Sequence, residues 1–535
     1  MQRWGQQLRS AWIHGLLAPR LAAGWAGVIL GLGALRWWGR RPGQSLVGWC
    51  LALLVIGLMG RQLWRVGRAL LTQAPGDFRS TPNGGRRVLA WAGLGLTGGI
   101  LALPWGLWGL SSRFWVRLPM PATLVNWVTL NRRPVLVVSG LLYLALVLWG
   151  VIWGPRHLPV TAAGHRGTSW QMLSGLGVQV GLLASWFAMS LAVVAVNRLA
   201  DRYFSAQVVR WVTRGSLLVI LAGFTLAALL GAVTLIWSWC GQPLQRPIHP
   251  HWALRWPFWG LVVSWLVISG AVVEQTVRQP DRFQATVTIS HRGVDHGVGV
   301  QNTLGALRHV HQEHPRYVEM DLHETRDHRW VVLHDENLQQ LAGRSVTPHQ
   351  LTLRQLERLT VRENGQSARL VGWDRYLQTA EDLRQPLLVE LKTTPQDSPG
   401  MIRRFARAYG RRLTRDRSAV HSLDYRVVAQ LRRDVPALRV GYITPFNWVA
   451  PSSVPADFYS FQRLSVSDQF VAAAHAAHAP AYLWTPDSPA AMTRLWALGA
   501  DGQITNELSR LQRVVTQPIR QAWWAVVMNF VLSYI

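Results

Sequence analysis

Two histidines of this sequence follow short β-rich stretches. His291, with Arg292 beside it, comes directly after the run TVTIS, and His334 comes directly after the run WVVL. An imidazole titrates near neutral pH, so it can take up and release protons during a reaction. A guanidinium carries a permanent positive charge and matches the oxygens of a phosphate. Two histidines and an arginine at strand ends therefore indicate acid–base chemistry on an anionic group.

Acidic side chains lie on neighbouring β-rich stretches. Glu319 and Asp321 are two residues apart in YVEMDL, so on a strand they point to the same face. Glu390 and Lys392 repeat this spacing in LLVELK, and Lys392 is the only lysine of the chain. In a sequence that otherwise uses arginine, a lone lysine indicates a site for a compact ammonium, although the arginine bias leaves chance open. Same-face carboxylates are typical of a divalent-cation site; a salt-bridge face for nearby arginines is the alternative.

The elements that must hold these side chains begin at about residue 284, where β-rich and helical stretches alternate as in βα units around a parallel sheet. The β-rich stretches are Thr286–Ser290, Tyr317–Leu322, Trp330–Leu333, Leu387–Leu391, Ala419–Leu423, Arg439–Ile443, Phe458–Phe461, Ala481–Trp484 and Gln503–Thr505. Only residues 323–329 separate the second and third, too few for a parallel crossover, so we expect a hairpin there. Eight parallel strands remain, which predicts a (β/α)8 barrel with its site at the carboxyl ends of the strands. A hairpin turn at residues 327–328 would place Asp321 opposite His334.

The first half of the chain has a different composition. Before residue 280 its only acidic residues are Asp77, Asp201 and Glu274, and its long apolar runs carry tryptophans at their ends. The runs are Leu21–Trp38, Leu46–Gly60, Val88–Leu110, Val135–Gly154, Met172–Val196, Leu217–Trp239 and Pro257–Val273. Because about 20 apolar residues cross a bilayer, we expect a multi-pass α-helical membrane domain of about seven spans over residues 1–280. Residues 516–535 form a short apolar tail.

The formal net charge of +28 is carried almost wholly by arginine. Such an excess often indicates a nucleic-acid partner, but much of it lies between the apolar runs, so we expect anionic lipid and no nucleic acid. The arginines of the loops do not fix the orientation in the membrane. Seven spans that start from a basic N-terminus on the inside predict a cell-membrane protein whose second half is extracellular. The oligomeric state stays open.

In their order and spacing, the motifs of residues 284–515 resemble a glycerophosphodiester phosphodiesterase domain. The matching pieces are HRG at 291–293, QNT at 301–303, EMD at 319–321, HD at 334–335, ELK at 390–392, LWT at 483–485 and DGQIT at 501–505. The apolar half resembles the membrane domain fused to some bacterial members of that family. A second HRG, at 165–167, follows no strand, and we interpret it as part of a loop.

The resemblance implies a TIM barrel of the phospholipase-C-like phosphodiesterase type, in a hydrolase that converts glycerophosphodiesters to glycerol 3-phosphate and an alcohol. The substrate class extends to lysolipids, and the head group is left open. A cation held by oxygen ligands alone is expected to be Mg²⁺ or Ca²⁺. The implied roles are acid–base catalysis for His291 and His334, cation binding for Glu319, Asp321 and Glu390, and substrate binding for Arg292, Lys392, Gln301 and Trp484.

Gln301 departs from the family pattern, in which many members have glutamate at this position. An amide neither accepts a proton nor adds negative charge. If the position only hydrogen-bonds, glutamine serves equally well; if it tunes the cation or a histidine, activity or metal preference changes. The alternative function is therefore a non-catalytic membrane protein that retains the barrel and binds lipids or phosphodiesters. Trp484 either floors the substrate pocket or packs in the core.

Overall fold

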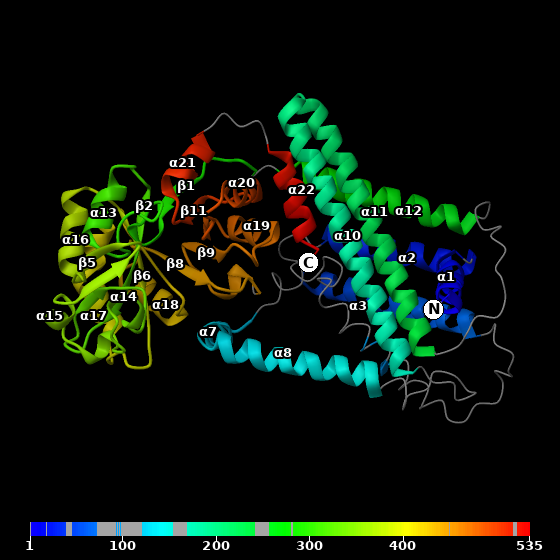
Figure 1. The fold of residues 1–535 in the computed structure, drawn as a ribbon, viewed down its shortest axis with the longest axis horizontal. Coiled ribbons are helices and arrows are strands. Elements are labelled where there is room, and N and C mark those ends of the chain that lie inside the picture. Colours follow the sequence, from blue (N-terminus) through cyan, green and yellow to red (C-terminus); the bar gives the residue numbers. More distant parts are fainter. Residues whose placement is uncertain are drawn as a thin grey trace. The chain divides into compact units, whose positions relative to one another are not determined.

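The computed structural model describes residues 2–17, 19–38, 45–71, 92, 93, 95, 97, 120–153, 168–240, 256–279, 282–448, 450–516 and 522–534. Internal contacts divide the chain into two units. The helical unit comprises residues 1–114, 133–279 and 530–535, and the barrel unit comprises residues 115–132 and 280–529. Figure 1 draws both units, and each is described here by itself.

The helical unit contains the long apolar helices that the sequence predicts. Its helices are α1 (Gln2–Leu17), α2 (Pro19–Trp38), α3 (Ser45–Leu71), α8 (Arg132–Leu148), which continues as the π-helical turn η2 (Trp149–Trp153), α10 (Ser169–Tyr203), α11 (Ala206–Cys240) and α12 (Trp256–Val277). Among the described residues, four helical stretches are long and apolar enough to cross a bilayer: 132–153, 169–203, 206–239 and 256–277. This helical region is consistent with a membrane domain. The run Val88–Leu110, apart from four positions, and the HRG at 165–167 lie outside the described residues.

Buried polar contacts join α10 to α11. The Asn197 amide donates to the Ser216 hydroxyl at 2.5 Å and accepts from the Thr213 hydroxyl at 3.1 Å. The Trp186 indole donates to the backbone oxygen of Ile220 at 3.1 Å. Polar groups that would otherwise face apolar surroundings find their partners across the helix pair, as in packed membrane helices.

The barrel unit is built on eight parallel strands, as the sequence predicts. They are β1 (Val287–Ser290), β2 (Tyr317–Glu324), β6 (Leu387–Leu391), β7 (Ala419–Ser422), β8 (Arg439–Thr444), β9 (Phe458–Gln462), β10 (Ala481–Trp484) and β11 (Gly502–Thr505). The sheet runs β1-β11-β10-β9-β8-β7-β6-β2 and closes where β2 pairs with β1 (Figure 1). The ninth predicted stretch is β3 (Trp330–Val332), which pairs antiparallel with β2. The predicted TIM barrel and its extra hairpin are confirmed.

The register of the β2–β3 hairpin differs by one residue from the prediction. Leu322 pairs with Val332, and the backbone oxygen of Asp321 accepts from the N–H of Leu333 at 3.0 Å. His334 therefore does not lie opposite Asp321, and that part of the prediction was wrong. In a strand a shift by one residue also exchanges the two faces, so this pairing does not bring the two side chains together.

A three-residue turn explains the shift. The N–H of Thr325 donates to the oxygen of Arg329 at 2.8 Å, which leaves residues 326–328 in the turn. The Thr325 hydroxyl donates to Asp327 at 2.6 Å, and His328 adopts the left-handed conformation with φ 57°. Hairpin loops of three residues commonly include one left-handed residue, whereas the sequence prediction assumed a turn of two.

Helices surround the barrel, and one small hairpin was not predicted. The hairpin consists of β4 (Thr360–Glu363) and β5 (Gln366–Arg369), and it lies outside the barrel sheet. The helices are η4 (His291–Gly293), α13 (Leu304–His311), α14 (Gln339–Ala342), η5 (Pro348–Gln350), α15 (Leu353–Leu356), α16 (Trp373–Asp382), α17 (Met401–Arg415), α18 (Tyr425–Asp434), η6 (Pro451–Ser453), α19 (Asp468–Ala476), α20 (Pro489–Leu498) and α21 (Leu508–Thr516). The last helix, α22 (Trp523–Leu532), contains the position at which the chain passes from the barrel unit to the helical unit. The apolar tail of the sequence thus contains a ten-residue helix.

A helix from the first half of the sequence packs on the barrel. In α7 (Ala122–Leu130), the Val125 side chain is fully buried in the core of the barrel unit. The Asn126 amide donates to Asp424 at 3.0 Å, and its oxygen accepts from the backbone N–H of Tyr425 at 2.6 Å. The described residues 120–132, which fall within the predicted membrane domain of residues 1–280, therefore group with the barrel.

Candidate active site

Three neighbouring strands place ionisable side chains in one row. Asp321 on β2 pairs in register with Glu390 on β6, and Glu390 pairs with His421 on β7. In a parallel sheet, residues in register point to the same side, and so do residues two apart on one strand. Glu319 therefore joins the row from β2. The register brings the predicted carboxylates together and adds a histidine to them.

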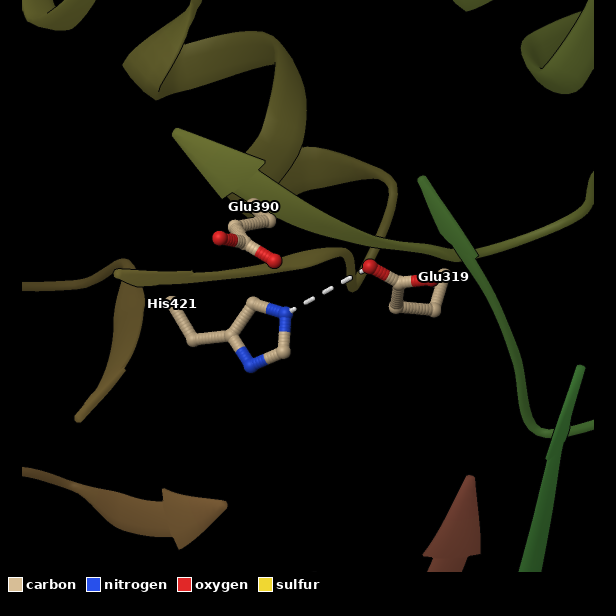
Figure 2. A group of neighbouring side chains, drawn as sticks. All are labelled: Glu319, Glu390 and His421. Atoms are coloured by element: carbon tan, nitrogen blue, oxygen red, sulfur yellow. Dashed lines mark ion pairs between the residues drawn. The ribbon is translucent and has the colours of Figure 1, made fainter. Parts of the chain in front are cut away.

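Figure 2 shows Glu319, Glu390 and His421 pointing toward one another. One ligand atom from each of the three lies within 4.8 Å of the other two, and all three residues are buried. His421 Nε2 is 3.9 Å from the Glu319 carboxylate. We call these three residues the open cluster. The sequence analysis missed His421, although it lies near the end of a predicted strand, where barrel side chains of this kind gather.

Asp321, the third predicted ligand, is turned toward other partners. Its carboxylate lies 3.2 Å from Lys392 Nζ and 3.8 Å from Arg292 Nε, and it accepts a hydrogen bond from Asn302 at 2.9 Å. Lys392 also donates to Glu390 at 2.9 Å. The only lysine of the chain thus neutralises part of the charge of two predicted ligands.

Burial and neighbouring charges move the pKa values of these carboxyls in opposite directions. Burial, together with the charges of Asp321 and Glu390, raises the pKa of Glu319 well above its usual value. Burial also raises the pKa of Glu390, against the opposing charge of Lys392. At Asp321 burial is outweighed by Lys392, His334 and Arg292, which hold its pKa well below the usual range. The three carboxyls of this row therefore outnumber the two cationic side chains, Arg292 and Lys392, that lie beside them.

His291 is held by an amide at the end of β11. Its Nδ1 lies 2.7 Å from Asn506 Oδ1, and because a carbonyl oxygen only accepts, the proton belongs to Nδ1. Nε2 is 4.0 Å from the Glu319 carboxylate. Burial and the nearby Arg292 lower the pKa of His291 to about 4, so this imidazole is neutral at pH 7. Burial also lowers the pKa of His421, to about 3.

His334 lies just beyond β3, and its side chain is 34% exposed. Its Nδ1 is 2.7 Å from the carboxylate of Asp335, its neighbour in the chain. Its backbone oxygen contacts Nε2 of the buried His323 at 3.1 Å. Asp335 fixes the ring so that Nδ1 is the donor and Nε2 remains for another partner. The HD pair of the sequence is therefore a hydrogen-bonded unit.

Gln301 links Arg292 to an acid that the sequence analysis did not consider. Its amide oxygen accepts from the Arg292 guanidinium at 2.8 Å, and its amide nitrogen donates to Glu363 at 2.6 Å. Glu363, on β4, also accepts from the backbone N–H of Gln301 at 2.8 Å. Glutamine meets both demands, because it accepts on one side and donates on the other. Glu363 lies on the unpredicted hairpin, so no pattern in the sequence pointed to it.

Trp484 is only partly buried at the end of β10. Its indole N–H donates to the backbone oxygen of Ser460 at 3.0 Å, and its ring packs against the apolar interior of the barrel. This contact anchors the indole at the carboxyl end of the barrel strands.

Comparison with known proteins identifies the barrel. The sequence model of the Glycerophosphoryl diester phosphodiesterase family matches residues 291–510. The barrel domain belongs to this family. A glycerophosphodiester phosphodiesterase of Caldanaerobacter subterraneus subsp. tengcongensis is 21% identical over 238 residues, which are 43% of this chain and 98% of the relative. The recognition made from the sequence motifs is confirmed.

Solved structures also align with this chain. A glycerophosphodiester phosphodiesterase from Parabacteroides distasonis is 22% identical and covers 43% of this chain and 96% of its own, with a TM-score of 0.37. A phosphodiesterase of Oleispira antarctica, determined with the product sn-glycerol-3-phosphate, is 18% identical and covers 43% and 97%, with a TM-score of 0.39.

The open cluster of the phosphodiesterase domain has the donors that a divalent cation needs. Two buried carboxylates face each other without a full set of counter-charges, and the buried His421 Nε2 has no hydrogen-bond partner among the described residues. Buried polar atoms normally find partners, so an orphaned nitrogen beside carboxylates marks a place for a cation. The residues present therefore fit a metal ion.

A second group in the same domain resembles the open cluster in composition only. Glu324, His349 and Asp397 also bring ligand atoms within 4.8 Å of one another. However, Glu324 accepts hydrogen bonds from Arg404 at 2.6 Å and from the backbone N–H of Ser398 at 2.7 Å. We call this group the saturated cluster, because the chain itself supplies its donors and its positive charge.

Proposed function

We propose that the barrel hydrolyses glycerophosphodiesters to glycerol 3-phosphate and an alcohol, with a divalent cation, in a protein anchored in a membrane. The observation that carries the proposal is the gathering of His291, two cationic side chains and three carboxylates at the carboxyl ends of the strands of a family domain, with His334 close enough for its charge to act on Asp321. The name of the Caldanaerobacter relative supports the choice of substrate.

Charge is the first requirement of this reaction, because a phosphodiester is an anion and resists attack. Arg292 and Lys392 would bind its oxygens, since both lie at the row of carboxylates. Gln301 holds the Arg292 guanidinium from the other side. Fixed positive groups of this kind stabilise the charge that builds up in the transition state.

A cation would be held by Glu319, Asp321 and Glu390. When bound, a divalent cation supplies additional positive charge that polarises a phosphoryl oxygen. Burial raises the pKa values of Glu319 and Glu390, so a bound cation would stabilise their charged forms, which agrees with this assignment. Asp321 would contribute its charge while it remains paired with Lys392.

His291 and His334 would move the protons. His291 carries its proton on Nδ1 through Asn506, so Nε2 is free to accept a proton from the nucleophile. His334 is held through Nδ1 by Asp335 and would exchange a proton with the leaving oxygen through Nε2. Each ring is fixed by a partner that leaves one nitrogen for the substrate, as general acid–base catalysis requires.

We place the helical unit in a bilayer because four of its described helical stretches have the required length and composition. An extracellular position of the barrel remains a prediction from the sequence. The test is to introduce single cysteines into the barrel and to treat intact cells with a membrane-impermeant thiol reagent. If these cysteines are protected from the reagent, the extracellular position is contradicted.

Turnover of the purified full-length chain tests the enzymatic part. We expect release of glycerol 3-phosphate from glycerophosphocholine, glycerophosphoethanolamine or a lysophospholipid, and loss of that release in EDTA. His291→Gln and His334→Gln should each abolish turnover without loss of folding. Phosphodiester binding without turnover on any of these substrates would contradict the proposal and favour a binding protein.

A further inference from the structure

We propose that His421 is a nitrogen ligand of the cation, and that the site therefore selects a first-row transition-metal dication over Mg²⁺ or Ca²⁺. This inference rests on the proposed function, since the cation in question is that of the phosphodiesterase site. It departs from the set of oxygen ligands that the sequence analysis expected.

His421 lies beside the two carboxylates of the open cluster. The register of the sheet sets it beside Glu390, and its Nε2 lies 3.9 Å from a Glu319 oxygen, with no hydrogen bond between them. The side chain is buried, with 3% of its surface exposed. Figure 2 shows the ring directed toward both carboxylates. A cation placed among the three would satisfy the nitrogen and both acids at once.

The other ring nitrogen of His421 contacts a hydroxyl group of the barrel. His421 Nδ1 lies 2.9 Å from the Ser460 hydroxyl on β9. When Nδ1–H donates to this hydroxyl, the lone pair of Nε2 is directed to the carboxylates. Histidines that bind metals are typically held in this way, with the second nitrogen donating to a fixed oxygen. Without a cation, this lone pair would face two carboxylates, an arrangement that electrostatics disfavours while both acids are ionised.

Neighbouring side chains restrict the imidazole ring of His421. Gly441 on β8 pairs in register with His421, and a Cβ atom at Gly441 would clash with the Phe458 ring. Phe458 therefore fills the space of the missing side chain, and its ring centroid lies 6.2 Å from that of His421. Ser460 and Phe458 together leave the imidazole little freedom, which is the preorganisation that a metal site needs.

The chemistry of the donors decides the class of cation. Carboxylates alone suit Mg²⁺ and Ca²⁺, whereas imidazole suits zinc and its neighbours, and affinity for nitrogen donors rises along the first row. Asp321 accepts from Asn302 and shares Lys392 with Glu390, whereas His421 Nε2 has no hydrogen-bond partner among the described residues. The imidazole can therefore join the carboxylates as a ligand without giving up an existing contact of this nitrogen. The site is therefore built for a mixed set of oxygen and nitrogen ligands.

Metal binding by the full-length protein tests the proposal independently of turnover. After removal of metals with a chelator, calorimetry should show tighter binding of Co²⁺ and Zn²⁺ than of Mg²⁺ and Ca²⁺. His421→Gln should weaken Co²⁺ binding at least ~10-fold, as loss of ligand contacts typically does, and should change the visible absorption spectrum of the bound Co²⁺. His421→Asp exchanges nitrogen for oxygen, so the preference for Co²⁺ over Mg²⁺ should fall.

His349→Gln is the matched control, because it removes a histidine from the saturated cluster of the same domain. It should leave both the affinity and the spectrum of Co²⁺ unchanged. Equal effects of the His349 and His421 variants, or a wild-type preference for Mg²⁺ or Ca²⁺, would overturn the assignment. If the protein turns over substrate with Mg²⁺ and His421 has no effect on metal binding, the proposed function holds and the role of His421 is wrong. If Co²⁺ binds through His421 but no substrate is turned over, the metal site holds and the proposed function is wrong.

Discussion

The open cluster and the saturated cluster contain two acids and one histidine each, and in both the ligand atoms lie within 4.8 Å of one another. They differ in what already surrounds them. In the saturated cluster His349 Nε2 contacts the Thr394 hydroxyl at 2.8 Å, and an arginine pairs with the buried Glu324. In the open cluster His421 Nε2 has no hydrogen-bond partner within the described part of the chain. A group of ligand-type residues is a metal site only where the protein leaves its donors unsatisfied.

Glu390→Gln should have the largest effect, because it removes a charge from the open cluster. We expect kcat/KM to fall about 10³-fold or more, since several kcal/mol of charge stabilisation depend on the cation site. Glu324→Gln makes the same chemical change in the saturated cluster and should leave turnover per folded molecule unchanged. Steady-state kinetics of both variants measure the contrast; equal losses of activity would contradict the distinction between the clusters.

Lys392→Met should rank second. Loss of one fixed positive group near the reacting phosphate typically reduces kcat at least ~10²-fold, and Lys392→Arg should restore only part of it because a guanidinium has a different geometry.

Lys392→Met should also change the thermal stability of the substrate-free protein. Lys392 pairs with Asp321 and Glu390 while only 13% exposed, so the methionine variant leaves buried acids without a counter-ion. Its melting temperature should fall in EDTA and recover on addition of a divalent cation. A melting temperature and turnover like those of the wild type would mean that the lysine has no role at the site.

Gln301→Glu should lower activity about 10-fold, by a loss of the order of one hydrogen bond to a charged group. The new carboxylate would face Glu363, which now lies 2.6 Å from the Gln301 nitrogen, and the like charges would displace it from Arg292. Glu363→Gln in the same chain should restore activity. Higher activity of the single variant would instead show that the family's usual glutamate is the better residue here.

The smallest effect is expected for Glu324→Gln in the saturated cluster, measured as a change in the free energy of unfolding. Burial alone would raise the pKa of Glu324, but hydrogen bonds from Ser398 and the Arg404 guanidinium outweigh it and lower the pKa. Because the folded pKa lies below the unfolded value of about 4.3, the stabilisation is complete above that pH and is lost as the pH falls through the folded pKa. Glu324→Gln should therefore reduce the free energy of unfolding by about 1–3 kcal/mol at pH 7 and by less near pH 3. Thermal melting at both pH values measures this difference; an undiminished difference at low pH would contradict the charged pair.

Strand positions could be predicted from the sequence because they depend on local patterns. Stretches such as Leu387–Leu391 and Ala481–Trp484 have the predicted bounds, since apolar β-rich runs between turn residues are recognisable one at a time. The seven residues between the second and third runs were enough to require a hairpin. Same-face spacing likewise placed Glu319 with Asp321 and Glu390 with Lys392, because the period of a strand is two.

The partners of these side chains were decided only by the tertiary structure. The hairpin register depended on one extra turn residue, and the contact of Gln301 with Glu363 spans 62 positions of the chain. His421 meets Glu390 because β7 pairs with β6, and it is held by Ser460 on β9, 39 residues further on. No local pattern encodes which strand lies beside which, at what register. The acids could therefore be identified from the sequence, whereas only the barrel decided that Lys392 pairs with Asp321 and Glu390, and that His421, whose Nε2 has no hydrogen-bond partner among the described residues, lies beside Glu319 and Glu390.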